Sequence, residues 1–600
     1  MDIKLNKLKP KIEKAALNGR YDFFEIRTSE KFFKHGAKIL DAPALCQNIE
    51  AVCFEGGAKF FTMMRKNEGN KNALIKTLRE TEGGDSISLK TILAGDLGDR
   101  TLLQLLLNSL GTYEAEFLRA SNLTGHLYYF NPKWLKQKQK GGQSFVAKIS
   151  ALEPRITENM ELVLNVRTFT SKKLKAQIHF EKGKSFESYP QYVNSERGAM
   201  RRALKEDKEK DHFIMRQTEG SKEAIAFLNL QSAELFAASK VGSLHEILAA
   251  FEKKFGELCK LEFETVTEDC AIELKNSASR QDKALVLELL KERQIKIVYE
   301  VLDQTSKCFC EKLKRLLKSD YGIEATIGRR ISKEALNLCV IHNEEYYGGD
   351  EDPHSKPRNG AVVQHVTLED FSPSSAVETV VHELLIKQDI RQGKLSLFAW
   401  PKAGFAEEVS FAVMRKIGEI SRYFFMKIFP DGTFKFEERK LDLFSENEYS
   451  TCLKIFDEHK ACEGLVKRAD GAINIIEKTE LFGLPDFEKI QRELGSGNNK
   501  LRGRARRNEL MASILDIRLF EHEGAKHYFV GTVGEGMKAK VACAANIRKV
   551  VPYGDAPVML EALLKLMDVR FVRTGRPTVV PFPFKYLNEW TDAKAGALST

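Results

Sequence analysis

The chain has 600 residues, of which 43% are hydrophobic, so its length and composition exclude a disordered protein and leave room for three or four domains. Its 94 Lys and Arg against 84 Asp and Glu give a net charge of +10, which permits binding to nucleic acid or to an anionic surface without requiring it. No apolar run has membrane-spanning length, the charged N-terminus lacks a signal-peptide core, and the ten cysteines are scattered without a CxxC pair, so we expect a cytoplasmic protein with reduced thiols.

The first part of the chain mixes strand-like and helix-like segments. Phe23–Thr28 has the character of a strand, and Thr101–Gly111 that of a helix. The basic stretch Lys133–Gln143 is interpreted as a loop and a domain boundary, and Glu161–Phe169 alternates as a half-buried strand does. We therefore predict an N-terminal domain over residues 1–145.

The next segment carries helix signals and one further strand. Arg197–Asp211 is charged on all sides, which favours an exposed helix or a linker. Ser243 and Glu246 have the spacing of a capping box, and Gly256 is placed to end the helix that follows it, before the alternating strand 258–266. These signals are structural and indicate no chemistry. We assign residues 146–300 to a linker region.

The middle of the chain is predicted to form a small α/β unit. It has the order of a strand, a turn, a strand and a helix, and the last three are expected at Gly348–Gly360, Ala361–Asp370 and Ala376–Lys387. If strand ends and helix start meet, the tyrosine pair, two lysines and a glutamine converge on one anion: Tyr346, Tyr347, Lys356, Gln364 and Lys387.

These residue types suit the end of a nucleic acid. A terminal phosphate offers several acceptor oxygens and up to two negative charges, so it favours ammonium groups and an amide donor, while an aromatic ring can stack on the first base. A Lys-rich unit of this kind also contains such residues by chance, and that alternative stays open on these residues alone.

The order Tyr, Lys, Gln, Lys, with Gln364 in VVQHVT and Lys387 in HELLIK, resembles the pocket for the guide 5′ end in the MID domain of prokaryotic Argonautes. The segment Ala525–Trp590, with paired strands, a helix and a P-x-P exit, resembles the close of a PIWI domain. The chain departs from the family in the turn between Tyr347 and Gln364, which is rich in Gly, Pro and acid. His342 or Tyr347 is therefore the alternative for the first pocket positions.

Active members of this family cut with a set of carboxylates, because two divalent metals need several such oxygens. The opening PIWI strand is interpreted as Arg422–Phe429 and holds no acid. Asp431 follows in PDGTF, where Asp-Gly favours a hairpin turn. Arginines replace the expected R-D-G step in Asn499–Leu510. The resemblance therefore implies a PIWI-like domain that holds nucleic acid without cleaving it.

The basic positions of this half are candidates for contacts with a nucleic-acid backbone, because phosphates attract arginine. The alternative is a solvated loop. The candidates are Arg502, Arg504, Arg506, Arg507, Arg573 and Arg576.

The resemblance implies an α/β multidomain protein with a Rossmann-like MID domain (301–415), an RNase H-like PIWI domain (416–600), α+β N-terminal and linker domains, and a reduced or absent PAZ domain. It further implies a short 5′-phosphorylated guide, with DNA favoured, a complementary target, and Mg²⁺ bridging the guide phosphate. A binder that does not cut needs an effector, so we expect a helicase or nuclease partner in plasmid or phage defence, similar to the Argonaute-like subunit of DdmDE systems.

Two alternatives remain. A guide-directed nuclease would need Asp431, Asp516 or Asp568 to form a metal site. A non-catalytic assembly subunit would carry no guide. Other enzyme classes lack their signatures, since His382-Glu383 is followed by Ile386 where a zinc protease needs histidine, and no P-loop or GxSxG occurs.

Overall fold

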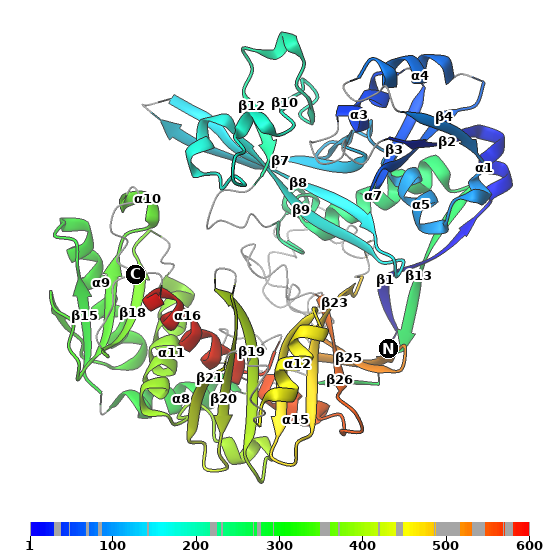
Figure 1. Cartoon of the computed structure of the whole chain (residues 1–600). Helices are drawn as coiled ribbons and strands as arrows, with labels where there is room; N and C mark the ends of the chain where they lie inside the picture. Colours follow the sequence, from blue (N-terminus) through cyan, green and yellow to red (C-terminus); the bar gives the residue numbers. More distant parts are fainter. Residues whose placement is uncertain are drawn as a thin grey trace. The chain divides into compact units, whose positions relative to one another are not determined.

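The structure of the chain is a computed structural model (Figure 1). It describes all residues except 1, 29–37, 47, 68–70, 82–86, 141–142, 217–224, 230–231, 268, 273–277, 292, 348–359, 370–372, 418–419, 440–447, 485–486, 488–516, 531–545, 568, 570–579 and 599–600. The chain divides into two compact units, unit 1 with residues 1–267, 480–514 and 533–546, and unit 2 with the remainder. The expected α/β multidomain class is confirmed, whereas the division into four domains stays a prediction.

The described residues of unit 1 form sheets with the strand orders β3-β4-β2-β5, β11-β10-β12-β9-β8-β7-β6 and β1-β13. Its strands are β1 Asp2–Ile12, β2 Tyr21–Arg27, β3 Ile49–Gly56, β4 Lys59–Arg65, β5 Ser88–Ile92, β6 Arg119–Leu123, β7 His126–Lys140, β8 Gln143–Ile156, β9 Leu162–Ser171, β10 Tyr192–Asn194, β11 Met200–Arg202, β12 His212–Met215 and β13 Cys259–Thr267. Its helices are α1 Lys14–Arg20, α3 Lys38–Asp41, α4 Lys71–Arg79, α5 Asp99–Asn108, α6 Ala233–Ala237 and α7 Lys240–Phe255, with short 3₁₀ turns η1 Ala42–Leu45, η3 Ala94–Asp96, η4 Lys172–Gln177, η5 Phe186–Ser188 and η6 Lys205–Asp207.

Helix α5 forms the centre of the unit 1 core. Its sequence DRTLLQLLLN is apolar on nearly every side, and Leu102, Leu103 and Leu106 are fully buried. A helix without a polar face must be covered all round. It packs against β3, β8 and α7, which explains how its run of leucines is accommodated.

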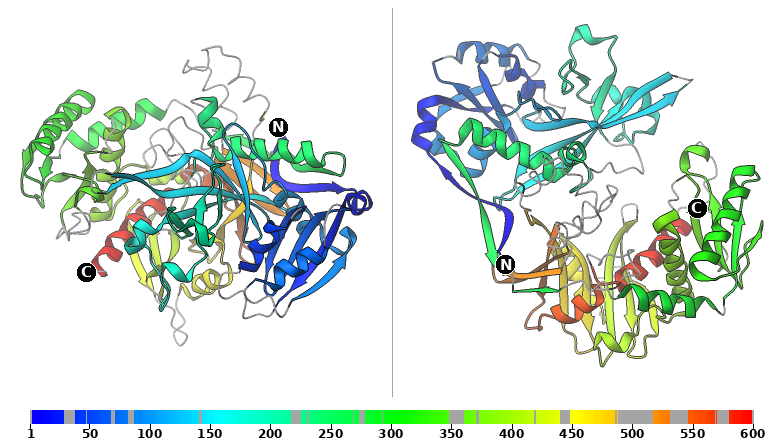
Figure 2. Two further views of the ribbon diagram at one scale, coloured as in Figure 1. Left: turned by 90° about the horizontal axis from the view of Figure 1, so that it is seen from above. Right: turned by 180° about the vertical axis from the view of Figure 1, so that it is seen from behind.

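The basic stretch is a strand from Lys133 to Lys140, so the prediction of a loop there is wrong. Strand β7 continues to Lys140, and Lys138 and Gln139 pair with Phe145 and Ser144 of β8. Figure 2 shows the two strands as a long ribbon. Basic composition does not distinguish an exposed strand from a loop, because both place these side chains in water.

Two further predictions in this unit are corrected: Arg197–Asp211, expected as an exposed helix or a linker, and the start of the helix at Ser243. Within Arg197–Asp211 the chain forms β11 and η6, held by Arg201, whose guanidinium donates to both carboxylate oxygens of Asp207 at 2.6 and 2.7 Å. Ser243 lies inside α7, because Ser239 caps that helix by accepting from Gly242 N–H. Gly242 permits this early start, since a Cβ there would lie 1.9 Å from the Phe236 carbonyl oxygen.

Unit 2 contains a four-stranded sheet in the order β16-β15-β17-β18 and a nine-stranded sheet in the order β14-β24-β25-β26-β23-β22-β19-β20-β21. Its strands are β14 Cys270–Ile272, β15 Ile295–Tyr299, β16 Thr326–Gly328, β17 Leu336–Ile341, β18 Val362–Thr367, β19 Val409–Ile417, β20 Ile420–Ile428, β21 Phe434–Arg439, β22 Cys462–Arg468, β23 Ile473–Phe482, β24 Ile517–His522, β25 Ala525–Val530 and β26 Asn546–Pro552. Its helices are α8 Ala278–Lys291, α9 Gln304–Tyr321, α10 Glu344–Tyr347, α11 Pro373–Gln392, α12 Ser450–Glu458, α15 Leu560–Met567 and α16 Pro583–Leu598, with the 3₁₀ turn η8 Trp400–Ala403.

The four-stranded sheet is parallel and is the predicted α/β unit of the middle of the chain. All six residues of β17 are buried, as expected for a parallel strand covered on both faces. Strand β15 lies between β16 and β17, which is the order of a doubly wound, Rossmann-like sheet. Helix α9 ends at Gly322, which adopts φ +66° as a left-handed cap.

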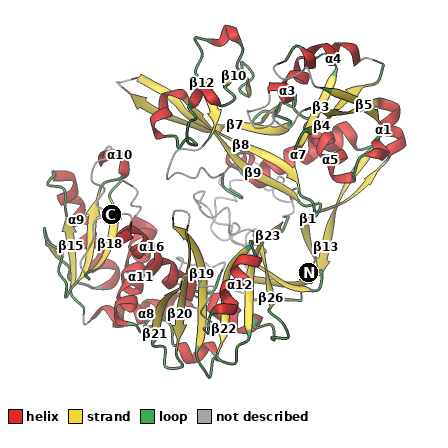
Figure 3. Cartoon of the chain, in the orientation of Figure 1, coloured by secondary structure: helices red, strands yellow, loops and turns green. Residues whose placement is uncertain are grey.

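In the nine-stranded sheet, the consecutive strands β19, β20 and β21 form an antiparallel meander. Asp431 and Gly432 form the predicted turn before β21, with Gly432 at φ +79°. The C-terminal helix α16 lies along β19 and β20 and beside α11, so both sheets of unit 2 share one core (Figures 1 and 3). No described helix has the length and apolar character that crossing a membrane requires.

Candidate functional site

The carboxyl ends of β15, β17 and β18 meet at one edge of the parallel sheet, because these strands run in the same direction. The chain leaves β15 toward β16 on one side and continues to β17 and β18 on the other. Sheets of this kind bind ligands outside the carboxyl ends of the strands where the strand order reverses. The residues after Tyr299 and Ile341 therefore occupy the position where a ligand is expected.

His342 is the centre of this edge. It follows β17 directly, is 6% exposed, and lies between two carboxylates. Its Nδ1 is 2.6 Å from Glu369 Oε1, and its Nε2 is 3.2 Å from Asp303 Oδ2. Asp303 is itself fixed as the cap of α9, since it accepts from the backbone N–H and the hydroxyl of Ser306, each at 2.7 Å. The ring orientation is thus set by carboxylates from two other segments of the chain.

These contacts decide the charge of the ring. Burial acts to lower the pKa of His342, but the hydrogen bonds to Glu369 and Asp303 outweigh it, and the net effect raises this pKa above its ordinary value. The pKa of each carboxyl is lowered although burial opposes it, Asp303 by Ser306 and His342 and Glu369 chiefly by His342. The charged imidazolium form therefore persists to a higher pH than in a free histidine.

Replacing Glu369 by glutamine is expected to lower the pKa of His342, because a neutral amide no longer stabilises the charged ring. The ordinary value is about 6.5, so the stability that the pair contributes is complete below that pH and is lost as the pH rises through the raised pKa. An NMR titration of the imidazole protons measures the change. Glu407→Gln, an exposed position of the same unit, serves as the control; an unchanged midpoint in Glu369→Gln would contradict the assignment.

An aromatic platform covers His342. The ring of Tyr346 stacks on the imidazole with centroids 3.8 Å apart and planes 10° apart, yet Tyr346 is 54% exposed. Tyr347 stands edge-on to Tyr346 at 5.2 Å, and its hydroxyl accepts from the His342 backbone N–H at 3.2 Å. The short helix α10 therefore offers an exposed ring that is held in place from below.

Gln364 and Lys387, predicted to meet, do come together on β18 and α11. Lys387 Nζ donates to the carbonyl of Val363 at 3.0 Å, beside Gln364 in the chain. Gln364 Nε2 donates to Glu383 of α11 at 2.7 Å and to the His365 carbonyl at 3.2 Å. Both are acceptors, which fixes the orientation of the amide and leaves the buried Oε1 without a hydrogen bond among the described residues.

Helix α16 completes this second cluster. Glu589 lies 3.2 Å from Lys387 Nζ, and Lys585 lies 3.6 Å from Glu383 and 3.7 Å from Glu589. Two ammonium groups and two carboxylates thus form one cluster, to which Gln364 is joined through Glu383. No sequence pattern linked α16 to this cluster, because α11 ends at Gln392 and α16 begins only at Pro583. The only available signal was the spacing of Lys585 and Glu589 by one helical turn.

The predicted residues lie at two different places along the sheet, Tyr346 and Tyr347 at one and Gln364 and Lys387 at the other. Gln364 pairs in register with Leu338, three residues before the end of β17, whereas Tyr346 and Tyr347 follow that end. Three residues of a strand span roughly 10 Å. Lys356 lies outside the described residues, as do the basic candidates Arg502, Arg504, Arg506, Arg507, Arg573 and Arg576.

Of the three candidate nuclease residues, only Asp431 lies among the described residues. Asp431 caps its own turn by accepting from the Thr433 backbone N–H at 3.0 Å and hydroxyl at 2.7 Å. Strand β19, which precedes the predicted opening strand, also contains no acid. Asp516 and Asp568 lie outside the described residues. Within the described part of the chain, no three His, Cys, Asp or Glu side chains are grouped to hold a metal ion.

No model of a known protein family matches the chain, and no curated protein matches it. Among solved structures the chain is similar to an X-ray crystal structure of Marinitoga piezophila Argonaute in complex with 5′ OH guide RNA and target DNA. The two share 10% sequence identity with a TM-score of 0.36, over 98% of this chain and 98% of that chain.

Proposed function

We propose that this chain is a guide-dependent nucleic-acid-binding protein that holds a short strand and recognises a complementary target. The observation that carries the proposal is the exposed ring of Tyr346, stacked on His342 at the carboxyl edge of the parallel sheet. Every base has a π face, so such a ring binds a terminal base without selecting its identity. Base pairing of the guide would then supply sequence recognition.

The guide is proposed to carry a 5′-phosphate held by Gln364 and Lys387, with Lys356 as a further ligand. Lys387 supplies an ammonium donor, and it is already placed beside Gln364 by its bond to the Val363 carbonyl. A phosphate would compete with Glu589 for Lys387. The Oε1 of Gln364 and the carboxylates of Glu383 and Glu589 are oxygen ligands of the kind that Mg²⁺ accepts, so they would hold a bridging Mg²⁺.

We propose that the protein binds its target without cutting it. Support comes from β19 and β20, which contain no carboxylate, and from Asp431, whose side chain is engaged in its own turn. A binder of this kind acts through another protein. We therefore propose a helicase or nuclease partner, a DNA target and a role in prokaryotic defence against plasmids or phage.

The experiment is to purify the protein from cells and extract the nucleic acid bound to it. We expect short 5′-phosphorylated oligonucleotides, and digestion with DNase or RNase identifies the guide. A preparation free of oligonucleotide would instead support an assembly subunit. Incubation with a labelled complementary target and Mg²⁺ or Mn²⁺ should leave the target intact; cutting that is lost in Asp431→Ala would establish the nuclease alternative.

A further inference from the structure

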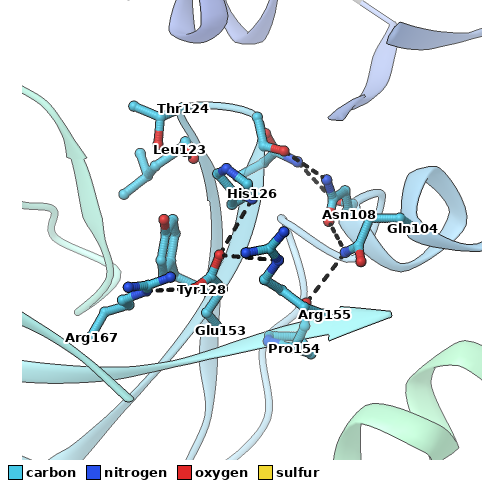
Figure 4. A network of polar contacts seen from close by, with 12 residues as sticks. Gln104, Asn108, Leu123, Thr124, His126, Tyr128, Glu153, Pro154, Arg155 and Arg167 are labelled. Atoms are coloured by element: carbon cyan, nitrogen blue, oxygen red, sulfur yellow. Dashed lines mark hydrogen bonds and ion pairs between the residues drawn. The ribbon is translucent and has the colours of Figure 1, made fainter. Parts of the chain in front are cut away.

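A separate cluster of charged side chains lies in unit 1, on one face of its seven-stranded sheet. Glu153 and Arg155 are two residues apart on β8, so their side chains share a face. Arg167 of β9 pairs in register with Ala151, two residues before Glu153, and therefore lies on that face as well. His126 of β7 completes the group (Figure 4).

The carboxylate of Glu153 organises this cluster. Its side chain is 1% exposed, with Arg167 Nε at 2.5 Å from Oε2, and His126 Nδ1 at 3.3 Å and Arg155 Nε at 4.0 Å from Oε1. Figure 4 shows the two guanidinium groups approaching the same carboxylate from different strands. The buried acid thus contacts arginines from two neighbouring strands.

Both arginines keep most of their donors available. Each contacts Glu153 through Nε, and among the described residues neither Arg155 nor Arg167 makes a hydrogen bond through its terminal nitrogens. Their side chains are 43% and 42% exposed. A guanidinium has a planar fork of N–H donors whose geometry matches the oxygens of a phosphate.

The backbone on both sides of Arg155 is fixed by a side chain of α5. Gln104 Nε2 donates to the Pro154 carbonyl at 3.3 Å, and Gln104 Oε1 accepts from the Ile156 backbone N–H at 2.9 Å. Asn108 holds the same amide, accepting from Gln104 Nε2 at 2.9 Å. This clamp positions Arg155 before any ligand arrives, which lowers the entropic cost of binding.

The charge balance of the cluster is positive. Burial lowers the pKa of His126 although Glu153 opposes the shift, so the ring is neutral near neutral pH. Two guanidinium groups against one carboxylate leave one net positive charge. A single arginine would suffice to compensate a buried carboxylate, so the second is available to an anion.

We propose that Arg155 and Arg167, held by Glu153, form a phosphate-binding fork for one backbone phosphate of a nucleic-acid strand. This proposal rests on the proposed function and adds a contact in unit 1 to it. In this arrangement the arginines touch the ligand, and Glu153 is a positioning residue.

The test measures binding of fluorescein-labelled single-stranded DNA and RNA oligonucleotides by anisotropy over a series of salt concentrations. Arg155→Gln combined with Arg167→Gln is expected to weaken binding about ten-fold or more. The slope of log affinity against log salt should decrease by about 0.7, which corresponds to one phosphate on a single strand. Arg197→Gln is the matched control, because Arg197 is a 45% exposed arginine of the same unit, already paired with Glu114.

The Glu153→Gln variant distinguishes a role of Glu153 in positioning the two arginines from the effect of its negative charge on phosphate binding. Removing a negative charge would strengthen phosphate binding by Coulomb attraction alone, whereas loss of the carboxylate that orders both arginines is expected to weaken it. Thermal melting shows whether each variant is folded. If the Gln double variant does not fold, Arg155→Lys with Arg167→Lys keeps both charges, and we expect its affinity to fall while its salt slope is unchanged.

Wild-type affinity and salt slope in the folded double variant would overturn the fork, and tighter binding by Glu153→Gln would overturn the positioning role. Both outcomes leave the proposed function intact, since the wild-type protein still binds the strand. Absence of binding by the wild-type protein itself is the separate result that contradicts the proposed function and the fork with it.

Discussion

Replacing Tyr346 by alanine is expected to weaken binding of a single-stranded oligonucleotide by about 1–3 kcal/mol, the usual contribution of one base stacked on an aromatic side chain. The ring is 54% exposed on one side and packs against His342 on the other, so its removal deletes the platform without opening the core. Anisotropy titration of a labelled strand gives the change in Kd. Tyr346→Phe should retain most of the affinity, because the π face is kept.

A matched control is Tyr553→Ala, since Tyr553 is another tyrosine of unit 2 and is 41% exposed. It should bind as the wild type does. Strands with different 5′ ends distinguish the role of the Tyr346 ring from that of Gln364 and Lys387. Tyr346→Ala is expected to weaken binding of 5′-phosphorylated and 5′-hydroxyl strands alike. Lys387→Ala combined with Gln364→Ala should mainly weaken binding of the phosphorylated strand. Equal losses in the lysine variant would remove the phosphate assignment, and wild-type binding by Tyr346→Ala would remove the platform.

Replacing Trp400 by alanine is expected to destabilise unit 2 by about 3–5 kcal/mol, as large-to-small changes of buried aromatic residues do. Trp400 is 1% exposed and stacks on Phe405, with centroids 5.5 Å apart and planes 11° apart. It also stands edge-on to Phe411 of β19 and to Phe582, which precedes α16. Chemical denaturation, monitored by far-UV circular dichroism because this signal reports the backbone and not the replaced tryptophan, measures the free energy of unfolding.

Trp400→Phe should cost much less. It keeps an aromatic ring in the cluster and removes an indole N–H that is buried without a hydrogen-bond partner among the described residues. Leu302→Ala is the surface control, because Leu302 is 69% exposed and such changes stay within about 0.5 kcal/mol. A cost for Trp400→Ala no greater than that of the surface control would show that this cluster does not stabilise the unit.

Predictions from the sequence succeeded where the pattern was local. The apolar strand before His342, the strand around Gln364 and helix α11 occur as expected, because alternation, turn residues and helical spacing act over a few residues. The turn at Asp431 and Gly432 was predicted for the same reason. The prediction of a loop at Lys133–Gln143 was wrong because basic residues suit an exposed strand as well as a loop.

Of the candidate site, the sequence by itself determined which residue types are present and the strand and helix that carry Gln364 and Lys387. Lys387 Nζ donates to the carbonyl of Val363, which precedes Gln364 in the chain. Only the tertiary structure decided their surroundings. Asp303, His342 and Glu369 meet because parallel strands end at one edge, and Glu589 reaches Lys387 because α16 packs beside α11. Such contacts join segments that are far apart in the chain. They stabilise the protein only after the core has formed and brought these segments together.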